Sequence, residues 1–188
     1  MTTNQIMKRR LPWVLGIIGV MVALDQLTKV WAVNNMQRLM DPIEYLGGLF
    51  NLRYVENRGA FLSLGNDLAP GLRMVLLNVL PALLLIGMLA YILRNRSLDR
   101  LQVIGLSSIV GGGLSNIVDR IAQGYVVDFM HMKGFGLQTG IFNVADLAIV
   151  FGMILILPSM IKGEKKAETK PEEAVQEQVD KPEVASDS

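Results

Sequence analysis

The sequence predicts an all-α membrane protein with four transmembrane helices and a small external β-sheet between the first and second helices. The chain of 188 residues is 51% hydrophobic and has a mean hydropathy of +0.38, which is too apolar for an ordinary soluble domain. Its apolar residues form four stretches long enough to cross a bilayer of about 30 Å, which takes about 20 helical residues. Clusters of Lys and Arg flank these stretches.

The four predicted spans are separated by polar segments and comprise Leu11–Val33, Gly71–Leu93, Leu101–Ile121 and Ile141–Ile161. The first span follows basic residues and so resembles a secretory signal peptide. Its small-residue cleavage pattern is weak, and cleavage just before Asp25 would remove a polar motif that begins there. We therefore expect the first span to be retained.

Basic residues predict the orientation of the spans. They precede the first span, fill the link between the second and third, and follow the fourth: Lys8, Arg9, Arg10, Arg94, Arg96, Arg100, Lys162, Lys165 and Lys166. Four crossings place all of them on one side, and the positive-inside rule makes that side cytoplasmic. Both chain termini are then cytoplasmic.

The segments outside the spans differ in character. A β segment at about 40–69 contains β-branched and aromatic residues that indicate two or three short strands beside the external membrane surface. The second external loop, Ala122–Gly140, is rich in glycine and is expected to be mobile. Residues 1–162 form the predicted four-helix domain, and 163–188 form a disordered cytoplasmic tail because they lack large apolar residues.

Composition excludes several kinds of site. The chain has no cysteine, so disulfides, thiolate metal ligands and a cysteine nucleophile are absent. It has one histidine, His131, which argues against a Ser-His-Asp triad and a histidine-rich metal centre. The net charge of +1 gives no reason to expect a nucleic-acid partner. We expect a monomer that needs no metal or other cofactor.

Polar residues within the spans converge at one depth. They lie in the second halves of spans one and three and in the first half of span four: Asp25, Gln26, Thr28, Lys29, Ser115, Asn116, Asp119, Arg120, Asn143 and Asp146. Each of these segments approaches the external side. An ionisable group near the bilayer centre costs roughly 2.5–3.5 kcal/mol even on lenient insertion scales. Such a cluster indicates one functional site near the external face.

Asp128 and Asp146 are the candidate catalytic residues. Each lies at the edge of an apolar segment among polar and glycine-rich residues. Two carboxylates in a poorly solvated site do not both ionise easily, so one proton tends to remain with the pair. A carboxylate with a carboxylic acid supplies the base and the acid that amide hydrolysis requires.

Several alternatives remain open from the residues alone. A small proton-coupled transporter or channel also uses intramembrane carboxylates, although a relay would spread them through the membrane depth. A non-catalytic assembly factor is a third reading. Asp25 and Lys29 form either an internal salt bridge or a substrate contact, and Asn143 shares a predicted helix face with Asp146. Gly111–Gly113 indicates close helix packing, or room for a lipid chain or a substrate helix.

The motifs together resemble lipoprotein signal peptidase, the signal peptidase II family. The matching elements occur in the family's order and reach into all but the second predicted span: Asp25-Gln-x-x-Lys29, Asn57-x-Gly-Ala-Phe61, Asn116-x-x-Asp-Arg120, Gly124-x-Val-Val-Asp-Phe129 and Phe142-Asn-x-Ala-Asp146. The chain departs from the family's usual pattern at Ser115, where glycine is commoner, and after Gly59, where one alanine replaces two.

The resemblance implies a bacterial inner-membrane aspartyl endopeptidase. Such enzymes remove the signal peptide of a prolipoprotein just before a cysteine that carries diacylglycerol, so the implied partners are these substrates and membrane lipid. Asp128 and Asp146 match the family's catalytic pair. The matching supporting or substrate-binding residues are Asp25, Lys29, Asn57, Asn116, Asp119, Arg120 and Asn143.

Overall fold

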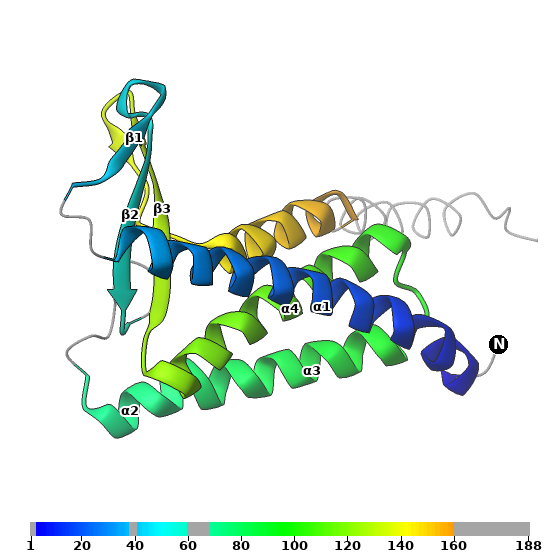
Figure 1. The fold of residues 1–188 in the computed structure, drawn as a ribbon. Coiled ribbons are helices and arrows are strands. Elements are labelled where there is room, and N and C mark those ends of the chain that lie inside the picture. The colour runs from blue at the N-terminus through cyan, green and yellow to red at the C-terminus, as the bar shows by residue number, and fades with distance from the viewer. Residues whose placement is uncertain (1–2, 38–40, 60–67, 160–188) are drawn as a thin grey trace, which may run out of the picture.

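The computed structural model describes residues 3–37, 41–59 and 68–159. It consists of a helical bundle with a small antiparallel sheet at one end (Figure 1). The tail and the motif residues Ala60 and Phe61 lie outside the described residues.

Among the residues that the structure describes, three helices are long and apolar enough to cross a membrane: Met7–Met36 within α1 (Thr3–Met36), Pro70–Arg94, and α4 (Arg100–Gln123). The second comprises α2 (Pro70–Met74), the π-helical turn η3 (Val75–Val79) and α3 (Leu80–Arg94). Pro81 follows the π-helical turn and lacks the N–H that a regular α-helix would use there. A further apolar helix, Val144–Ser159, is shorter than these three within the described residues.

The helix ends follow local sequence signals. Asp99 begins α4 as a capping box, in which its side chain accepts from the Gln102 N–H and the Gln102 side chain accepts from the Asp99 N–H. Gly124 ends α4 in the left-handed conformation, with a φ of 82°. The helix expected to start at Ile141 begins instead at Val144, because Asn143 caps it.

The α4 helix lies at the centre of the bundle, and its glycines permit this position. A Cβ at Gly111 would come within 2.8 Å of Met21 on α1, and one at Gly113 within 2.9 Å of Leu85 on α3. A Cβ at Gly112 would collide with the Ala145 carbonyl oxygen of the helix Val144–Ser159. The three consecutive glycines thus face three different helices, which confirms the close-packing interpretation.

The sheet contains four strands in the order β1-β2-β3-β4, with antiparallel pairing. Their bounds are β1 Ile43–Tyr45, β2 Phe50–Asn57, β3 Val126–Gly134 and β4 Leu137–Gln138. The short turn η1 (Leu46–Gly48) joins the first two strands. The register between β2 and β3 shifts between Leu52 and Val55, which marks a bulge.

The expectation that the second external segment is a loop was wrong. Residues 122–140 contain β3 and β4, so half of the sheet comes from this segment and not from residues 40–69. Val127 and Phe129 of β3 pack with Leu52 of β2 and with Ala32 and Met36 near the end of α1. This core attaches the sheet to the bundle.

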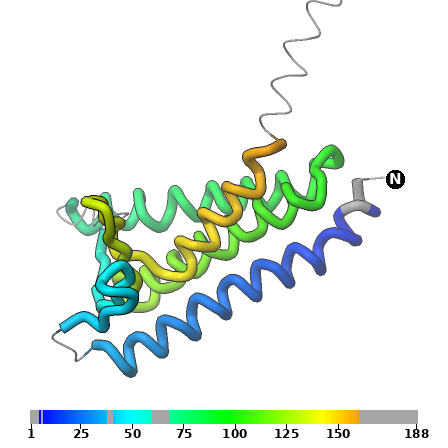
Figure 2. The backbone as a smooth tube through the Cα atoms, turned by 90° about the horizontal axis from the view of Figure 1, so that it is seen from above, coloured from blue at the N-terminus to red at the C-terminus, as the bar shows by residue number. Residues whose placement is uncertain are grey.

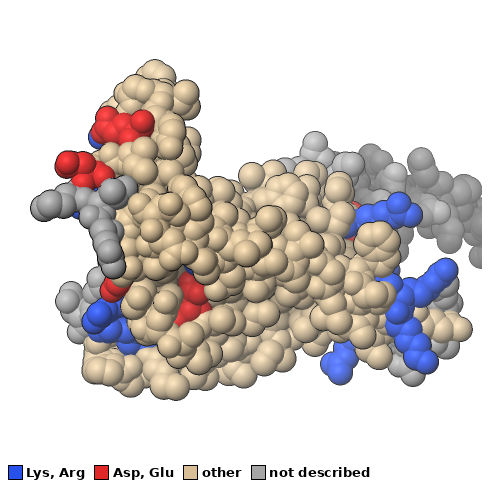
Figure 3. Space-filling view, in the orientation of Figure 1, with Lys and Arg blue, Asp and Glu red and all other residues tan. Residues whose placement is uncertain are grey.

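The two ends of the bundle differ in charge. Figure 3 shows Lys and Arg side chains where α1 begins and where α3 connects to α4, at the end opposite the sheet, whereas at the sheet end Lys and Arg lie among Asp and Glu side chains. One of these residues, Arg10, donates hydrogen bonds to the carbonyl oxygens of Ile92, Asn95 and Leu98. Its guanidinium therefore ties the start of α1 to the link between α3 and α4.

Candidate active site

Asp128 lies near the start of β3 and is almost completely buried, with 3% of its surface exposed. Its Oδ2 accepts a hydrogen bond of 2.9 Å from the Asn57 amide on β2. Its Oδ1 accepts a hydrogen bond of 2.7 Å from the Asn143 amide. Two neutral amides from different parts of the chain thus hold the carboxylate at the point where the sheet meets the helices.

Asp146 lies in the first turn of the helix Val144–Ser159 and forms a reciprocal cap with Asn143. Its backbone N–H donates to Asn143 Oδ1 at 3.0 Å, and its Oδ2 accepts from the Asn143 N–H at 3.1 Å. The pattern is the capping-box arrangement, with Asn and Asp in the capping positions. The first turn of a helix also carries partial positive charge, which favours a carboxylate there.

Asn143 contacts both candidate catalytic carboxylates. Its side-chain amide donates to Asp128 and its backbone N–H donates to Asp146. The expected shared helix face is therefore replaced by a more specific arrangement, because Asn143 precedes the helix. The two aspartates are held beside each other through one residue.

Asn116 on α4 links this pair to the helix bundle. Its amide nitrogen donates to Asp146 Oδ1 at 3.1 Å. Its oxygen accepts from Asn143 Nδ2 at 3.1 Å and from Lys29 Nζ at 2.9 Å. Because a lysine ammonium only donates, the Lys29 contact determines which end of the Asn116 amide faces Asp146.

A second group of carboxylates surrounds Lys29. Its ammonium lies 2.6 Å from Asp25 Oδ2 and 2.7 Å from Asp119 Oδ2, and all three side chains are buried. Asp25 also accepts from the Ser115 hydroxyl at 2.7 Å and from the Ala145 N–H at 2.8 Å. The internal salt bridge that was one of the two interpretations of Asp25 and Lys29 is thus present. It also supports the start of the helix that carries Asp146.

Arg120 and Asn57 border the site on the side of the second strand. Arg120 Nη2 donates to the Gly59 carbonyl oxygen at 2.8 Å, and Asn57 Oδ1 accepts from the Gly59 N–H at 3.0 Å. Both contacts shape the chain just before residue 60. Within the described residues, Asp119 forms its ion pair with Lys29, and Arg120 donates to the backbone carbonyl oxygens of Asn116 and Gly59.

Burial raises the pKa of Asp128 to about 6, from an ordinary value of 3.8. The neighbouring Asp146 charge raises the pKa further, whereas the hydrogen bonds from Asn57 and Asn143 lower it. A carboxyl that titrates near neutral pH suits proton transfer at physiological pH.

The nine residues expected at the site therefore form one connected network in the structure. Sequence reasoning assigned no role to two further members, Gln26 and Ser115. Gln26 donates to Ser115 Oγ at 2.9 Å and to Asp119 Oδ1 at 2.8 Å. Their position among polar span residues was the available signal. His131, expected in a loop, lies instead on β3 opposite Asn51.

A small cavity of about 220 Å³ adjoins the Lys29 cluster, between α1 and α4. It is lined by Gln26, Lys29 and Asp119 among others. Within the ranges that the structure describes, no group of three or more His, Asp or Glu residues is arranged to hold a metal ion.

Comparison with known families gives a match over most of the chain. The sequence model described as signal peptidase (SPase) II matches residues 17–162. A protein named lipoprotein signal peptidase from Clostridium acetobutylicum is 33% identical over 153 residues, which is 80% of this chain and 95% of that protein. One of the same name from a Nostoc species is 39% identical over 150 residues, which is 80% of this chain and 89% of that protein.

Solved structures show the same fold. A bacterial membrane enzyme determined by the in meso method at 2.3 Å resolution superposes with a TM-score of 0.71 at 25% identity, covering 82% of this chain and 91% of the other. A second, determined at 1.9 Å resolution, gives a TM-score of 0.70 at 26% identity over 80% of this chain and 94% of the other.

Proposed function

The chain belongs to the signal peptidase II family, and we propose that Asp128 and Asp146 are its catalytic pair. The protein is an aspartic protease that cleaves the signal peptides of prolipoproteins. The observation that carries the assignment of the pair is the position of Asn143, which donates to one carboxylate with its side chain and to the other with its backbone.

In the proposed reaction, the ionised carboxylate takes a proton from a water molecule, and the oxygen of that water attacks the scissile carbonyl carbon. The protonated carboxyl gives its proton to the carbonyl oxygen, which forms a neutral tetrahedral intermediate. The carboxyl that gained a proton then transfers it to the amine nitrogen as the C–N bond breaks. Loss of the hydroxyl proton to the other carboxylate restores the starting state.

The supporting residues keep the two catalytic carboxylates in position relative to each other. Asn57 and Asn143 orient Asp128, Asn116 orients Asp146, and the Lys29 cluster fixes Asn116. Arg120 shapes the backbone at Gly59, next to the pair. Proton transfer by positioned groups contributes typically about 10²–10⁴-fold to rate, so even small displacements of these carboxylates are expected to lower activity.

Family membership and the apolar helices indicate a multi-pass protein of the bacterial inner membrane. We propose that Val144–Ser159 belongs to a fourth span, that residues 1–162 form the peptidase domain, and that both termini are cytoplasmic. The active site then lies near the external face. The basic end of the bundle and the sheet at the opposite end support this orientation (Figures 1 and 3).

We further propose that the substrate cysteine carries diacylglycerol, that membrane lipid surrounds the bundle and that the enzyme acts as a monomer. The transporter alternative has no support from the family comparison. The carboxylates of the described spans, Asp25, Asp119 and Asp146, also join a single network instead of following one another through the membrane.

The test uses purified protein with two matched peptides that contain the same signal sequence. One carries diacylglycerol on the cysteine and the other has the free thiol. Release of the signal peptide from the lipidated peptide alone is the expected result. Equal cleavage of both would refute the lipid requirement, and cleavage of neither would refute the proposed substrate.

A further inference from the structure

The free end of the sheet carries large apolar side chains that nothing in the described chain covers. The exposed fractions are 77% for Leu46, 44% for Leu49, 50% for Met132, 101% for Phe135 and 79% for Leu137. These five residues come from both hairpins and are called the sheet tip below. An exposed group of this kind on a membrane enzyme marks a contact surface.

The backbone at the tip is unusual in both hairpins. Leu46 has a φ of 54° and Phe135 a φ of 53°, in the left-handed region that large side chains rarely adopt. Each is followed by glycine, at Gly47 and Gly136, also with positive φ. Each of the two hairpins therefore places its most exposed apolar side chain at its turn.

The sheet extends sideways from the bundle. In Figure 1 the strands run across the direction of the helices, and the hairpin ends project past the side formed by α1 and Val144–Ser159. Figure 2 shows that the sheet stays at one end of the bundle, level with the helix ends. In the proposed orientation the tip therefore lies over the external leaflet, beside the bundle.

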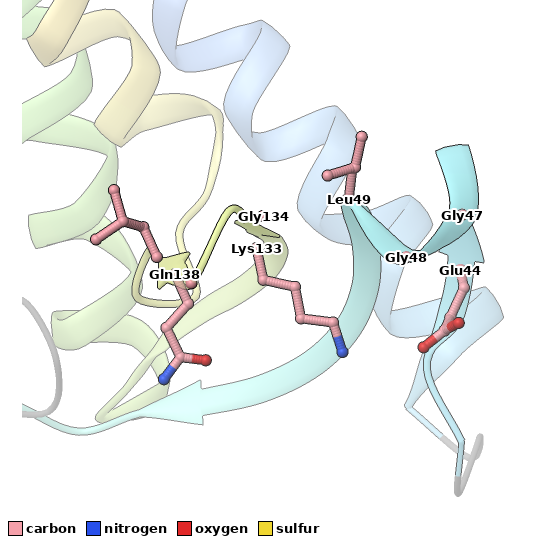
Figure 4. Close-up of a pocket in the computed structure, with 9 residues that line it drawn as sticks. Glu44, Gly47, Gly48, Leu49, Lys133, Gly134 and Gln138 are labelled. Carbon is pink, nitrogen blue, oxygen red and sulfur yellow. The ribbon is translucent and has the colours of Figure 1, made fainter.

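Two adjoining cavities at the tip differ in chemistry. One of about 580 Å³ has Glu44 and Lys133 among its lining residues, and Figure 4 shows both charged side chains extending into it. The other, of about 430 Å³, is lined largely by apolar residues that include Leu46, Phe50 and Phe135. They share Leu49, Lys133 and Leu137 on their walls. Among the described residues, the ion pairs within 4.0 Å are those of Lys29, so Glu44 and Lys133 face this space without pairing.

We propose that the sheet tip is a phospholipid-binding surface that inserts into the external leaflet. Leu46, Phe135 and Leu137 enter the acyl-chain boundary. Lys133 faces the lipid phosphate, and Glu44 faces the ammonium group of a zwitterionic headgroup. This combination of apolar side chains below a charged layer is the pattern of proteins that lie in a membrane interface.

The surface has a consequence for catalysis, because β3 carries Asp128 near one end and the tip at the other. Gly134 is six positions after Asp128, which corresponds to about 20 Å of extended strand. The bundle holds the strand at the Asp128 end through Asn57 and Asn143. Lipid holds it at the far end, so membrane attachment steadies the strand that positions one catalytic carboxylate.

The test exploits the absence of cysteine from the chain, which makes a single introduced cysteine a unique attachment point. A nitroxide is placed at Phe135→Cys, and in a second variant at Leu46→Cys, in vesicles of phosphatidylethanolamine and phosphatidylglycerol. Frequent collision of the nitroxide with oxygen shows that the label lies in lipid. Frequent collision with a water-soluble nickel chelate shows that it lies in water. Controls are Leu83→Cys on the exposed face of α3 and Ser97→Cys in the basic link.

The expected result is a nickel accessibility at positions 135 and 46 several-fold below that at position 97, with oxygen accessibility approaching that at position 83. Accessibility equal to position 97 would overturn the proposal. So would protection that arises only when lipopeptide substrate is added, because the tip would then be a substrate surface.

A second readout is cleavage by a Phe135→Ser, Leu137→Ser variant, with the wild-type protein as the reference. Its activity is expected to fall several-fold in vesicles and to match wild type in detergent, whereas equal activity in both media contradicts the role of lipid attachment. The inference rests on the proposed membrane orientation. The catalytic assignment is tested independently of the lipid proposal. It would be wrong if Asp128 or Asp146 variants remained active while the nitroxide labels at the sheet tip still reported contact with lipid.

Discussion

Two groups of carboxylates lie close together in this protein and have different partners. Asp25 and Asp119 share the Lys29 ammonium at 2.6 and 2.7 Å. Asp128 and Asp146 are held by the amides of asparagines and by a backbone N–H. Among the described residues, the ion pairs within 4.0 Å leave this second pair without a cation.

The difference separates a structural role from a reactive one. A buried carboxylate beside an ammonium stays ionised, and removing either partner leaves an uncompensated charge. A buried carboxylate that receives only neutral hydrogen bonds retains a raised pKa, as Asp128 does. The same residue type thus provides a fixed support in one group and an exchangeable proton in the other.

The largest expected effect is on activity, from neutral replacements in the reactive pair. Asp128→Asn or Asp146→Asn should lower cleavage by about 10²–10⁴-fold or more, because each removes a proton-transfer group. Asp41→Asn, at an exposed position just before β1, serves as the control and should cleave at the wild-type rate. A folded Asp128→Asn protein with appreciable activity would exclude Asp128 from the chemistry.

The next effect is on stability, from loss of the shared cation. Lys29→Met leaves Asp25 and Asp119 buried without compensation and should lower the free energy of unfolding by about 3–5 kcal/mol. Thermal unfolding in detergent measures this change. Adding Asp25→Asn and Asp119→Asn to Lys29→Met should restore part of the loss. If the triple variant is no more stable than Lys29→Met, uncompensated charge is not the cause.

Much of this arrangement was predictable from sequence. The polar residues of three apolar stretches indicated one site, and the motif order identified the family. The strand β3 was missed because its first residues, Val126 to Phe129, are all buried. A strand covered on both faces lacks the alternation of apolar and polar residues that reveals a half-exposed strand. Its flanking glycines cap α4 and form the hairpin turn, although they had suggested mobility.

The partners of individual side chains were less accessible to sequence reasoning. Spacing placed Asp25 beside Lys29 on one helix, but the contact between Lys29 and Asp119 joins two helices. The capping role of Asn143 depends on where the last helix begins. A hydrophobic pattern locates the first residue of a helix only to within two or three positions. Asn57 reaches Asp128 through strand pairing, which no local pattern specifies.

A smaller effect distinguishes the two groups of carboxylates. Replacing one member of each group by Asn should change the free energy of unfolding in opposite directions. The folded-state pKa of Asp128, about 6, lies above its ordinary value, so ionisation opposes folding as pH rises through that range. Asp128→Asn should therefore stabilise the protein by about 1–3 kcal/mol at pH 8 and have little effect at pH 4. Asp25→Asn should destabilise it at pH 8. Unfolding midpoints at both pH values provide the measurement, and stabilisation by both substitutions would contradict the distinction.

The smallest effect is a shift in the pH dependence of cleavage. The Asn57 hydrogen bond favours ionised Asp128, so Asn57→Ala should raise the pKa of Asp128. The limb of the activity profile that titrates near pH 6 should move upward by about one pH unit. Tyr54→Phe is the matched control on β2, because the Tyr54 hydroxyl contacts Glu56 instead. Equal profiles for Asn57→Ala and wild type would remove Asn57 from the tuning of Asp128.

Infrared spectroscopy of the protonated carboxyl stretch, recorded as a function of pH, tests the central distinction most directly. The expected result is a carboxylic-acid band that titrates near pH 6, disappears in Asp128→Asn and persists in Asp119→Asn. A band that survives in Asp128→Asn and is lost in Asp119→Asn would show that the exchangeable proton belongs to the Lys29 cluster, contradicting the assignment of the reactive pair.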